Sequence, residues 1–238
     1  MRLLLILCFC CSVLTTFGQS AEYRITTGLV GDQLFSAGFF VRFPVNSTLT
    51  NVFYIEQNAS ISPYLGIEKL HENGWRQSWS ILRADFSDGD FYIVNSDPSL
   101  GVFEPASGEV RKQISLNLRW ASGKTITPLS GERFVTSLSL AADPFLLYYR
   151  SIPNTSAAFP FTFTQVGVTG SLLPQFEYRI TSRLGVVLQT PITLGRIYWQ
   201  KAYLQNPVLT EPQKANTLTN AEVKLRPNQL LLGVSYKL

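Results

Sequence analysis

Apolar and polar side chains alternate along much of this 238-residue chain. The longest alternating stretch runs from Thr164 to Thr181, where Val166, Phe176 and Tyr178 share one parity and polar side chains hold the other. Successive side chains of a β-strand point to opposite faces, so this stretch predicts a strand with one apolar face. Globular strands average about five or six residues, whereas about 9–11 residues cross a bilayer core. The pattern therefore predicts a membrane-spanning strand.

The same alternation recurs between turn-forming segments and predicts an all-β fold. Gly31-Asp32 and Ser182-Arg183 are interpreted as tight turns. A closed antiparallel up-and-down transmembrane β-barrel of eight strands follows from this reading. The expected strands are Tyr23–Val30, Leu34–Phe43, Asn51–Leu70, Ile114–Trp120, Arg133–Ala141 continuing to Phe145–Tyr149, Thr164–Thr181, Leu184–Leu194 and Gln229–Leu238.

The region from His71 to Gly108 has no simple alternation. It is interpreted either as one long surface loop or as an extra hairpin between Ile81 and Val94 that turns at Ser87–Asp90. Long structureless loops are uncommon, so part of the region is expected to pair. If the hairpin belongs to the wall, the barrel has ten strands.

The carboxyl-terminal stretch ends on an apolar residue. From Gln229 onwards, one face is wholly apolar and the other is mostly polar or small, with Leu231 as an exception. Gly233, Tyr236 and Leu238 have the spacing of a glycine, an aromatic and a terminal apolar residue. This stretch is predicted to be the closing strand of the barrel, with those three residues as its assembly signal.

The amino terminus predicts a secretory signal peptide over residues 1–18, with Gln19 as the first mature residue and 19–238 as the barrel domain. Arg2 precedes an apolar run and then small or polar residues, which are the three zones of such a peptide. The run is too short to cross a membrane as a helix. All three cysteines, Cys8, Cys10 and Cys11, fall within it, and the residues before them fit a lipidated cysteine poorly.

Charge argues against one class of partner, and hydropathy argues against a helical membrane span. The net charge of +4 is mild and evenly spread, which argues against nucleic acid as a partner. No apolar run long enough for a transmembrane helix follows the signal, so a membrane location requires closed β-structure.

Alternation alone leaves open which face meets lipid. A secreted lipocalin-type barrel would place the apolar face inside, around a ligand. The length of the strands, and a carboxyl terminus that ends within a strand, favour an apolar face that points outwards to lipid. Counting back from a periplasmic carboxyl end places Ser182-Arg183 and Pro44–Thr50 on the periplasmic side and the His71 region outside. Two aromatic girdles are expected, with Tyr23, Trp120, Tyr178 and Tyr236 near periplasmic strand ends and Tyr148, Tyr198 and Trp199 near outer ends.

Two segments carry a family resemblance. Pro174–Gly185 and Leu232–Leu238 resemble the small outer-membrane β-barrel proteins of Bacteroidetes-type bacteria, a porin-like or OmpA-barrel-like family. The resemblance implies a barrel in the outer membrane of a Gram-negative bacterium. Because that family is defined mostly by fold, it implies little about a specific function.

Candidate chemistry is sparse. The single histidine, His71, has no local partner for general-base catalysis and is expected to be a solvated loop residue. Asp85, Asp88 and Asp90 lack calcium-loop spacing and fit a hairpin turn better. No metal, cofactor or catalytic site is therefore expected. The loop aromatics Trp75, Trp79, Phe91 and Phe103 are candidates for contacting a surface partner or for packing on one another.

Charged residues of the polar parity form the main candidate site. They are interpreted as a paired interior network, or as the lining of a narrow pore for small solutes. An eight-stranded barrel has little room for a channel, which favours the network. The chain is thus predicted to be a monomeric, non-enzymatic envelope protein with a structural or surface-interaction role, in contact with outer-membrane lipid and the barrel-assembly machinery. The candidate interior residues are Arg24, Arg42, Glu68, Arg119, Glu177, Arg179 and Lys237.

Overall fold

The computed structural model describes residues 21–32, 37–44, 50–57, 60–87, 90–97, 102–126, 133–153, 159–227 and 229–238. The predicted signal peptide lies outside these residues. In the described part, no helix is long and apolar enough to cross a membrane. The strands are β1 (Ala21–Asp32), β2 (Ala37–Pro44), β3 (Thr50–Gln57), β4 (Ser60–His71), β5 (Trp75–Ser87), β6 (Asp90–Asp97), β7 (Val102–Thr125), β8 (Phe134–Pro153), β9 (Phe161–Arg179), β10 (Leu184–Gln189), β11 (Ile192–Leu204), β12 (Ala215–Pro227) and β13 (Gln229–Lys237), with one short helix, α2 (Glu211–Lys214).

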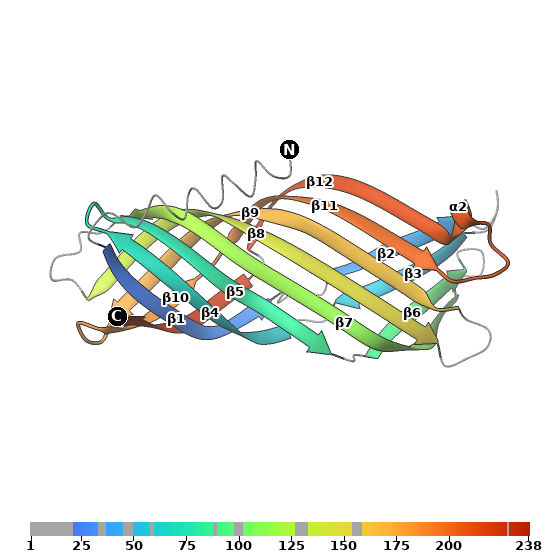
Figure 1. Cartoon of the computed structure of the whole chain (residues 1–238), viewed down its shortest axis with the longest axis horizontal. Helices are drawn as coiled ribbons and strands as arrows, with labels where there is room; N and C mark the ends of the chain where they lie inside the picture. The colour runs from blue at the N-terminus through green and yellow to red at the C-terminus, as the bar shows by residue number, and fades with distance from the viewer. Residues whose placement is uncertain are drawn as a thin grey trace.

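Eight strand segments form a closed antiparallel ring. Its order is β1, β4, β5, β7, β8, β9, β10 and β13, and β13 pairs with β1 to close it. The prediction of an all-β closed eight-stranded barrel is confirmed. Figure 1 shows these long strands tilted along the molecule, with the carboxyl terminus at one end and α2 at the other.

Several strand segments are continuations of one another rather than separate hairpins. β1 pairs with β4 and β2 pairs with β3 in nearly the same register, so the chain runs through Gly31-Asp32 in one direction. The predicted turn there is wrong. β5 and β6 both lie antiparallel to β7, which makes them successive parts of one strand. The hairpin at Ser87–Asp90 and the ten-stranded alternative are therefore also wrong.

The turns fall at two ends of the barrel. Glu72–Gly74 and the bend at 180–183 lie at the same end as the carboxyl terminus. Gly74 has a φ of 78°, a conformation that favours glycine, and its N–H donates to the His71 carbonyl at 2.9 Å. The His71 turn was predicted for the opposite end, and Pro44–Thr50 for this one. Both placements are wrong because β1 and β2 form one continuous strand. β2 therefore ends, and β3 begins, at the end opposite the carboxyl terminus, and β4 returns to the carboxyl-terminal end.

The two side-chain parities separate cleanly across the wall. On β8, Leu140 is 61% exposed on the outside whereas the neighbouring Ala141 is 7% exposed. The polar parity of β9, including Gln165, Gln175 and Glu177, is buried inside. The lipocalin-type alternative, with apolar side chains around a cavity, is wrong for this ring. Outward apolar residues include Ile25, Leu29, Leu65, Ile67, Leu118, Leu138, Val166, Val168, Leu232 and Val234.

Aromatic side chains lie on the outer face towards both ends. Trp120 and Tyr178 lie near the carboxyl-terminal end, and Trp199 lies towards the other. Trp79 pairs with Trp120 across β5 and β7, so Trp75 and Trp79 are wall residues and not the loop residues that were expected. The outward aromatics of the carboxyl-terminal end include Trp75, Trp120, Phe134, Phe176, Tyr178 and Tyr236.

Candidate functional site: the barrel interior

A network of ion pairs crosses the interior near the carboxyl-terminal end. The Arg24 guanidinium donates from Nη1 to Glu177 Oε1 at 2.5 Å and from Nε to Glu22 Oε1 at 2.6 Å. Arg76 donates two hydrogen bonds to the Glu68 carboxylate, at 2.7 and 2.6 Å, which is the bidentate geometry that guanidinium groups favour. The Arg76 Nη2 atom also lies 3.6 Å from Glu177 Oε2, so Glu177 joins the two halves of the network.

Strand register explains why these residues meet. Arg24 on β1 lies directly opposite Glu68 on β4, and β5 next to it carries Arg76. Glu177 comes from β9, separated from β1 by β10 and β13, so its contacts with Arg24 and Arg76 span the interior. Each of Arg24, Arg76 and Glu177 is almost fully buried. The interior is therefore filled with paired charges at this level.

Burial makes this network sensitive to loss of one member. Moving charges out of water is costly, and Coulomb attraction offsets that cost only when the geometry is good and the remaining polar atoms find partners. Here each carboxylate faces at least one guanidinium within 2.7 Å. Removing Glu177 would leave two guanidinium groups facing each other across the interior.

Most predicted interior residues fall in or beside this network. Arg179 lies 3.9 Å from Glu177, and Lys237 donates to Glu22 Oε2 at 2.6 Å near the rim. The structure thus brings together Arg24, Glu68, Glu177, Arg179 and Lys237. The side chain of Arg42 lies outside the described residues.

Two network residues were missed in the sequence. Glu22 shares the parity of Arg24 but precedes the strand start that was predicted at Tyr23. Arg76 lies in the region interpreted as a loop, although it is followed by Ser78 and Ser80 at the same parity. Glu22 would have been identified by starting the first strand at Ala21. Arg76 would have been identified by starting the arm before Ile81 at Trp75.

A second ion pair lies further from the carboxyl terminus. Arg119 on β7 donates to both carboxylate oxygens of Asp143 on β8, at 2.8 and 2.6 Å, and to Gln229 Oε1 at 2.9 Å. Asp143 was missed because Asp143-Pro144 was interpreted as an interruption within the strand. β8 continues through it, so its carboxylate points inwards and is only 4% exposed.

An apolar layer contains Leu231, which had been the exception on the polar face of the closing strand. Leu231 packs with Val30, Tyr64 and Leu82, all buried inside. Along β13 it lies between Gln229 and Lys237, the residues that contact the two ion-pair groups. Apolar packing therefore separates the two polar levels.

Glycine makes room for the Tyr64 ring in this layer. A Cβ atom on Gly233 would meet the Tyr64 hydroxyl and the Thr27 carbonyl at distances that no real side chain tolerates. The Tyr64 ring thus lies over the backbone of β13, and Gly233 is required for this close approach. The predicted assembly residue Gly233 has a packing role that its place in the terminal spacing does not reveal.

Polar side chains of β9, β11 and β12 form a third interior group. The Arg196 guanidinium lies 4.2 Å from the Phe145 ring centroid and 5.0 Å from that of Tyr198, and it donates to Gln165 Oε1 at 2.8 Å. Tyr198 donates to Glu222 Oε1 at 3.0 Å. Tyr198 was predicted for the outer girdle, but its side chain points inwards.

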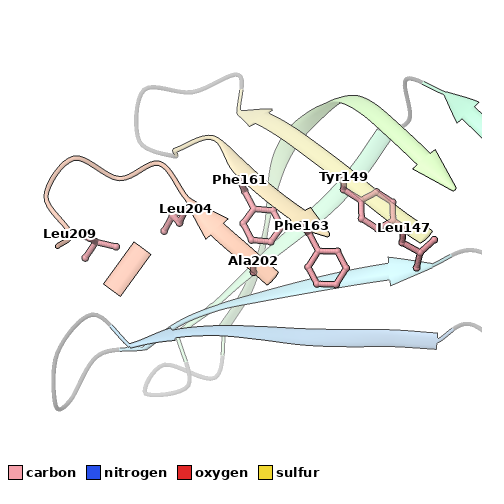
Figure 2. Close-up of a cluster of buried hydrophobic side chains, with 7 residues drawn as sticks. All are labelled: Leu147, Tyr149, Phe161, Phe163, Ala202, Leu204 and Leu209. Carbon is pink, nitrogen blue, oxygen red and sulfur yellow. The ribbon is translucent and has the colours of Figure 1, made fainter. Parts of the chain in front are cut away.

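The end opposite the carboxyl terminus is filled by apolar side chains, shown in Figure 2 pointing from β8, β9 and β11 towards the blue strands β2 and β3. Tyr149 and Phe163 stack with ring centroids 6.0 Å apart. Leu209, from the loop before α2, is buried in the same cluster. The cluster, hereafter the outer apolar cluster, consists of Leu147, Tyr149, Phe161, Phe163, Ala202, Leu204 and Leu209.

The remaining sequence candidates lie apart from these groups. His71 is at the end of β4, beside a tight turn. Asp85 and Asp90 lie on β5 and β6, and Asp88 is outside the described residues. Phe91 and Phe103 lie on β6 and β7 rather than in a loop. Within the described ranges, no group of His, Cys, Asp and Glu side chains is arranged to hold a metal ion.

Comparison with known proteins identifies the fold. No protein-family model and no curated protein sequence matches the chain. Its structure is similar to that of the outer membrane protein OprG from Pseudomonas aeruginosa, with a TM-score of 0.57 and 10% identity over 92% of this chain and 97% of that one. This likeness shows a shared barrel fold.

Two further outer-membrane structures align over 92% of this chain and all of theirs, at TM-scores too low to support any conclusion. They are a major outer membrane protein from Thermus thermophilus, with a TM-score of 0.43 and 10% identity, and Neisserial surface protein A, with a TM-score of 0.39 and 11% identity.

Proposed function

We propose that this chain is an integral outer-membrane β-barrel protein of a Gram-negative bacterium. The observation that carries the proposal is the exposed apolar face of the closed ring, where Leu29, Leu140 and Leu232 are each more than half exposed. A soluble protein rarely exposes a contiguous apolar band of this extent. In a bilayer the same band faces hydrocarbon, and ring closure satisfies the backbone groups within it.

The filled interior favours a non-enzymatic role, either structural or in presenting the outer loops to a partner. Paired charges, an apolar layer and the outer apolar cluster occupy successive levels of the interior. The buried titratable residues at these levels are mainly carboxylate–guanidinium pairs, which neutralise one another. Such pairs hold strands in register and give no nucleophile or base of their own.

Targeting and assembly complete the proposal. Residues 1–18 would direct export and be removed, and Gly233, Tyr236 and Leu238 would be recognised by the barrel-assembly machinery. β13 supports this reading because it closes the ring between β10 and β1, and the Leu238 N–H donates to the Tyr23 carbonyl at 3.0 Å. We further propose that the protein is a monomer and belongs to the Bacteroidetes-type family.

A narrow pore is the alternative function. The observation in its favour is the run of polar side chains along the interior parity of β9, but several of these side chains are hydrogen-bonded to side chains of the neighbouring strands β10 and β11. Conductance across planar bilayers distinguishes the two. We expect no steady single-channel current from the native protein, and a stable ohmic conductance would establish the pore.

Heat-modifiable migration tests the outer-membrane proposal itself. Outer membranes are dissolved in mild detergent and analysed by electrophoresis with and without boiling. We expect the unboiled protein to migrate faster, because a closed barrel resists detergent, and to shift on heating. Recovery of the protein from the periplasm or medium with no shift would contradict the proposal.

A further inference from the structure

The outward face of β8, β9 and β11 changes from apolar to polar towards the α2 end. These strands are hydrogen-bonded neighbours, and Figure 1 shows them running side by side to that end. On β9, the outward side chains of Val166 and Val168 are 45% and 46% exposed. The next two outward residues towards the α2 end are Thr164 and Thr162. Tyr148, an aromatic residue of the kind that marks a membrane interface, lies directly opposite Thr164. The edge of the apolar band therefore lies between Val166 and Thr164.

Two exposed basic residues flank the two threonines. Arg150 on β8 lies directly opposite Thr162, and Lys201 on β11 lies directly opposite Thr164. Every outward side chain of β8 from Phe134 to Tyr148 is uncharged. On β11, the outward residues Ile197 and Trp199 come before Lys201. Both basic residues thus lie just beyond the apolar band. The group of Arg150, Thr162, Thr164 and Lys201 is hereafter the basic patch.

The donors of the basic patch are available to a ligand. Among the described residues, the side chains of Arg150 and Lys201 have no hydrogen-bond or ion-pair partner. The hydroxyls of Thr162 and Thr164 are likewise without a partner there and add two further donors. The nearest printed carboxylate contact on this face belongs to Glu211, which is already paired with Lys214 at 2.9 Å. An anionic group on this patch would therefore face two positive charges that no carboxylate shares.

The spacing of the two basic residues favours a ligand with two anionic groups. Neighbouring strands lie about 4.8 Å apart, and residues i and i+2 of one strand lie about 6.7 Å apart. Arg150 and Lys201 are separated by two strand spacings and by one step of two residues, so their Cα atoms lie about 12 Å apart. A phospholipid head group carries a single phosphate, whereas a disaccharide with a phosphate at each end presents two.

We propose that the basic patch binds a bisphosphorylated glycolipid of the outer leaflet, of the lipid A class. One phosphate accepts charge-assisted hydrogen bonds from Arg150 and the other accepts them from Lys201. The sugars lie over Thr162 and Thr164, and the acyl chains run down the apolar band past Val166. The inference rests on the proposed function, because an outward parity in lipid and a periplasmic carboxyl terminus together place the α2 end in the outer leaflet.

Native mass spectrometry tests binding to the full-length mature protein. The protein, folded in mild detergent, is titrated with bisphosphorylated lipid A, and the bound fraction gives an apparent dissociation constant. The same lipid with both phosphates removed is the comparison. We expect a one-to-one complex with lipid A and about tenfold weaker binding of the dephosphorylated form, because the charge-assisted hydrogen bonds are lost. Equal affinity for the two forms would overturn the proposal.

Two double variants locate the site. Arg150→Gln with Lys201→Gln removes both charges of the basic patch and should weaken lipid A binding about tenfold. Lys124→Gln with Arg183→Gln makes the same change in charge at exposed positions of the carboxyl-terminal end and should leave binding unchanged. Equal losses in the two double variants would indicate attraction to the overall charge and contradict a defined site.

A charge-preserving variant separates binding from folding. Arg150→Lys with Lys201→Arg keeps both charges and should bind lipid A within about threefold of the native affinity. All three double variants change exposed side chains and should keep the heat shift of the native protein. A charge-preserving variant that keeps the heat shift but binds as weakly as the glutamine variant would overturn the role assigned to charge.

A phospholipid competitor distinguishes the two sources of lipid phosphate. Phosphatidylglycerol has one phosphate, so about tenfold more of it than of unlabelled lipid A should be needed to displace half of the bound lipid A. Displacement at equal concentrations would overturn the assignment to a bisphosphorylated glycolipid. Loss of the heat shift in the native protein would instead overturn the proposed function, which separates the two failures.

Discussion

The carboxyl-terminal half of the barrel and the opposite half are stabilised in different ways. In the first, eight strands form a continuous ring around buried ion pairs. In the second, the sheet has two edges: β12 pairs with β11 and β2 pairs with β3, but β12 and β2 share no ladder in the described residues. In the described residues, this half contains the outer apolar cluster together with the polar group of Arg196, Tyr198 and Glu222. Ring closure by backbone hydrogen bonds thus coincides with the network of buried ion pairs, whereas the half with two sheet edges combines an apolar cluster with the polar group of β9, β11 and β12.

Loss of Glu177 should cause the largest decrease in stability, because it breaks the ion-pair network of the carboxyl-terminal half. Glu177→Leu leaves Arg24 and Arg76 buried without their shared carboxylate, and breaking a buried pair costs about 3–5 kcal/mol. We expect a matching decrease in the free energy of unfolding from vesicles in urea. Val168→Leu, an outward change on the same strand, is the control and should be near neutral. Equal stability of both variants would show that the network does not hold the ring.

Truncation of the outer apolar cluster should have a more local effect. Phe163→Ala removes a fully buried ring that stacks on Tyr149, a change that typically costs about 3 kcal/mol. Hydrogen exchange should accelerate in β8, β9 and β11 near the α2 end while β1 and β13 keep their protection. Uniform acceleration over the whole barrel would show that the two halves unfold together.

A bulkier residue at Gly233 should lower the free energy of unfolding by about 1–3 kcal/mol, because its side chain would overpack against Tyr64. Gly233→Val is expected to lower the temperature of the heat shift. Combining it with Tyr64→Leu should restore part of the loss, because the clashing ring is gone. If the double variant is no better than the single one, then the close approach of Tyr64 is not the reason for glycine at this position.

The smallest expected effect concerns the loop near α2. Lys214 Nζ donates to Glu211 Oε1 at 2.9 Å, which lowers the pKa of Glu211 below 4.5 and raises the pKa of Lys214 above 10.5. The contribution of Glu211 is therefore present above pH 4.5 and lost as the pH falls through its lowered pKa. The pair lies at the surface, with the Glu211 side chain 72% exposed, so solvent screening keeps the effect small. Protection factors of the loop amides, which compare the measured exchange rate with the unfolded-peptide rate at the same pH, should fall slightly at about pH 3 while those of the ring are unchanged, and Glu211→Gln should remove this difference.

The sequence predicted the strands whose alternation is uninterrupted. The strand predicted for Thr164–Thr181 corresponds to β9, and that predicted for Gln229–Leu238 corresponds to β13, each within a few residues. Gly31-Asp32 and Ser87–Asp90 contain residues typical of turns, yet the chain continues through both in one direction. Backbone pairing with β4 keeps the first segment extended, and pairing with β7 keeps the second extended. Local turn preference does not predict these long-range pairings.

The interior site was harder to predict because its members come from strands far apart in sequence. Parity alone identified Arg24, Glu68 and Glu177 as inward residues. It could not pair Arg24 with Glu177, since that contact depends on how the ring closes across β10 and β13.

The most direct test of the account asks which parity meets lipid. All three cysteines precede residue 12, so a chain expressed from Gln19 onwards has no cysteine and single cysteines can be introduced in it without background. Nitroxide labels at Leu140→Cys and Ala141→Cys, neighbours on β8, are compared in vesicles for collision with oxygen and with a water-soluble nickel complex. We predict high oxygen accessibility at position 140 and low accessibility at position 141, repeating along the strand with period two. Equal accessibility, or the reverse order, would contradict a lipid-facing apolar parity and with it the outer-membrane barrel.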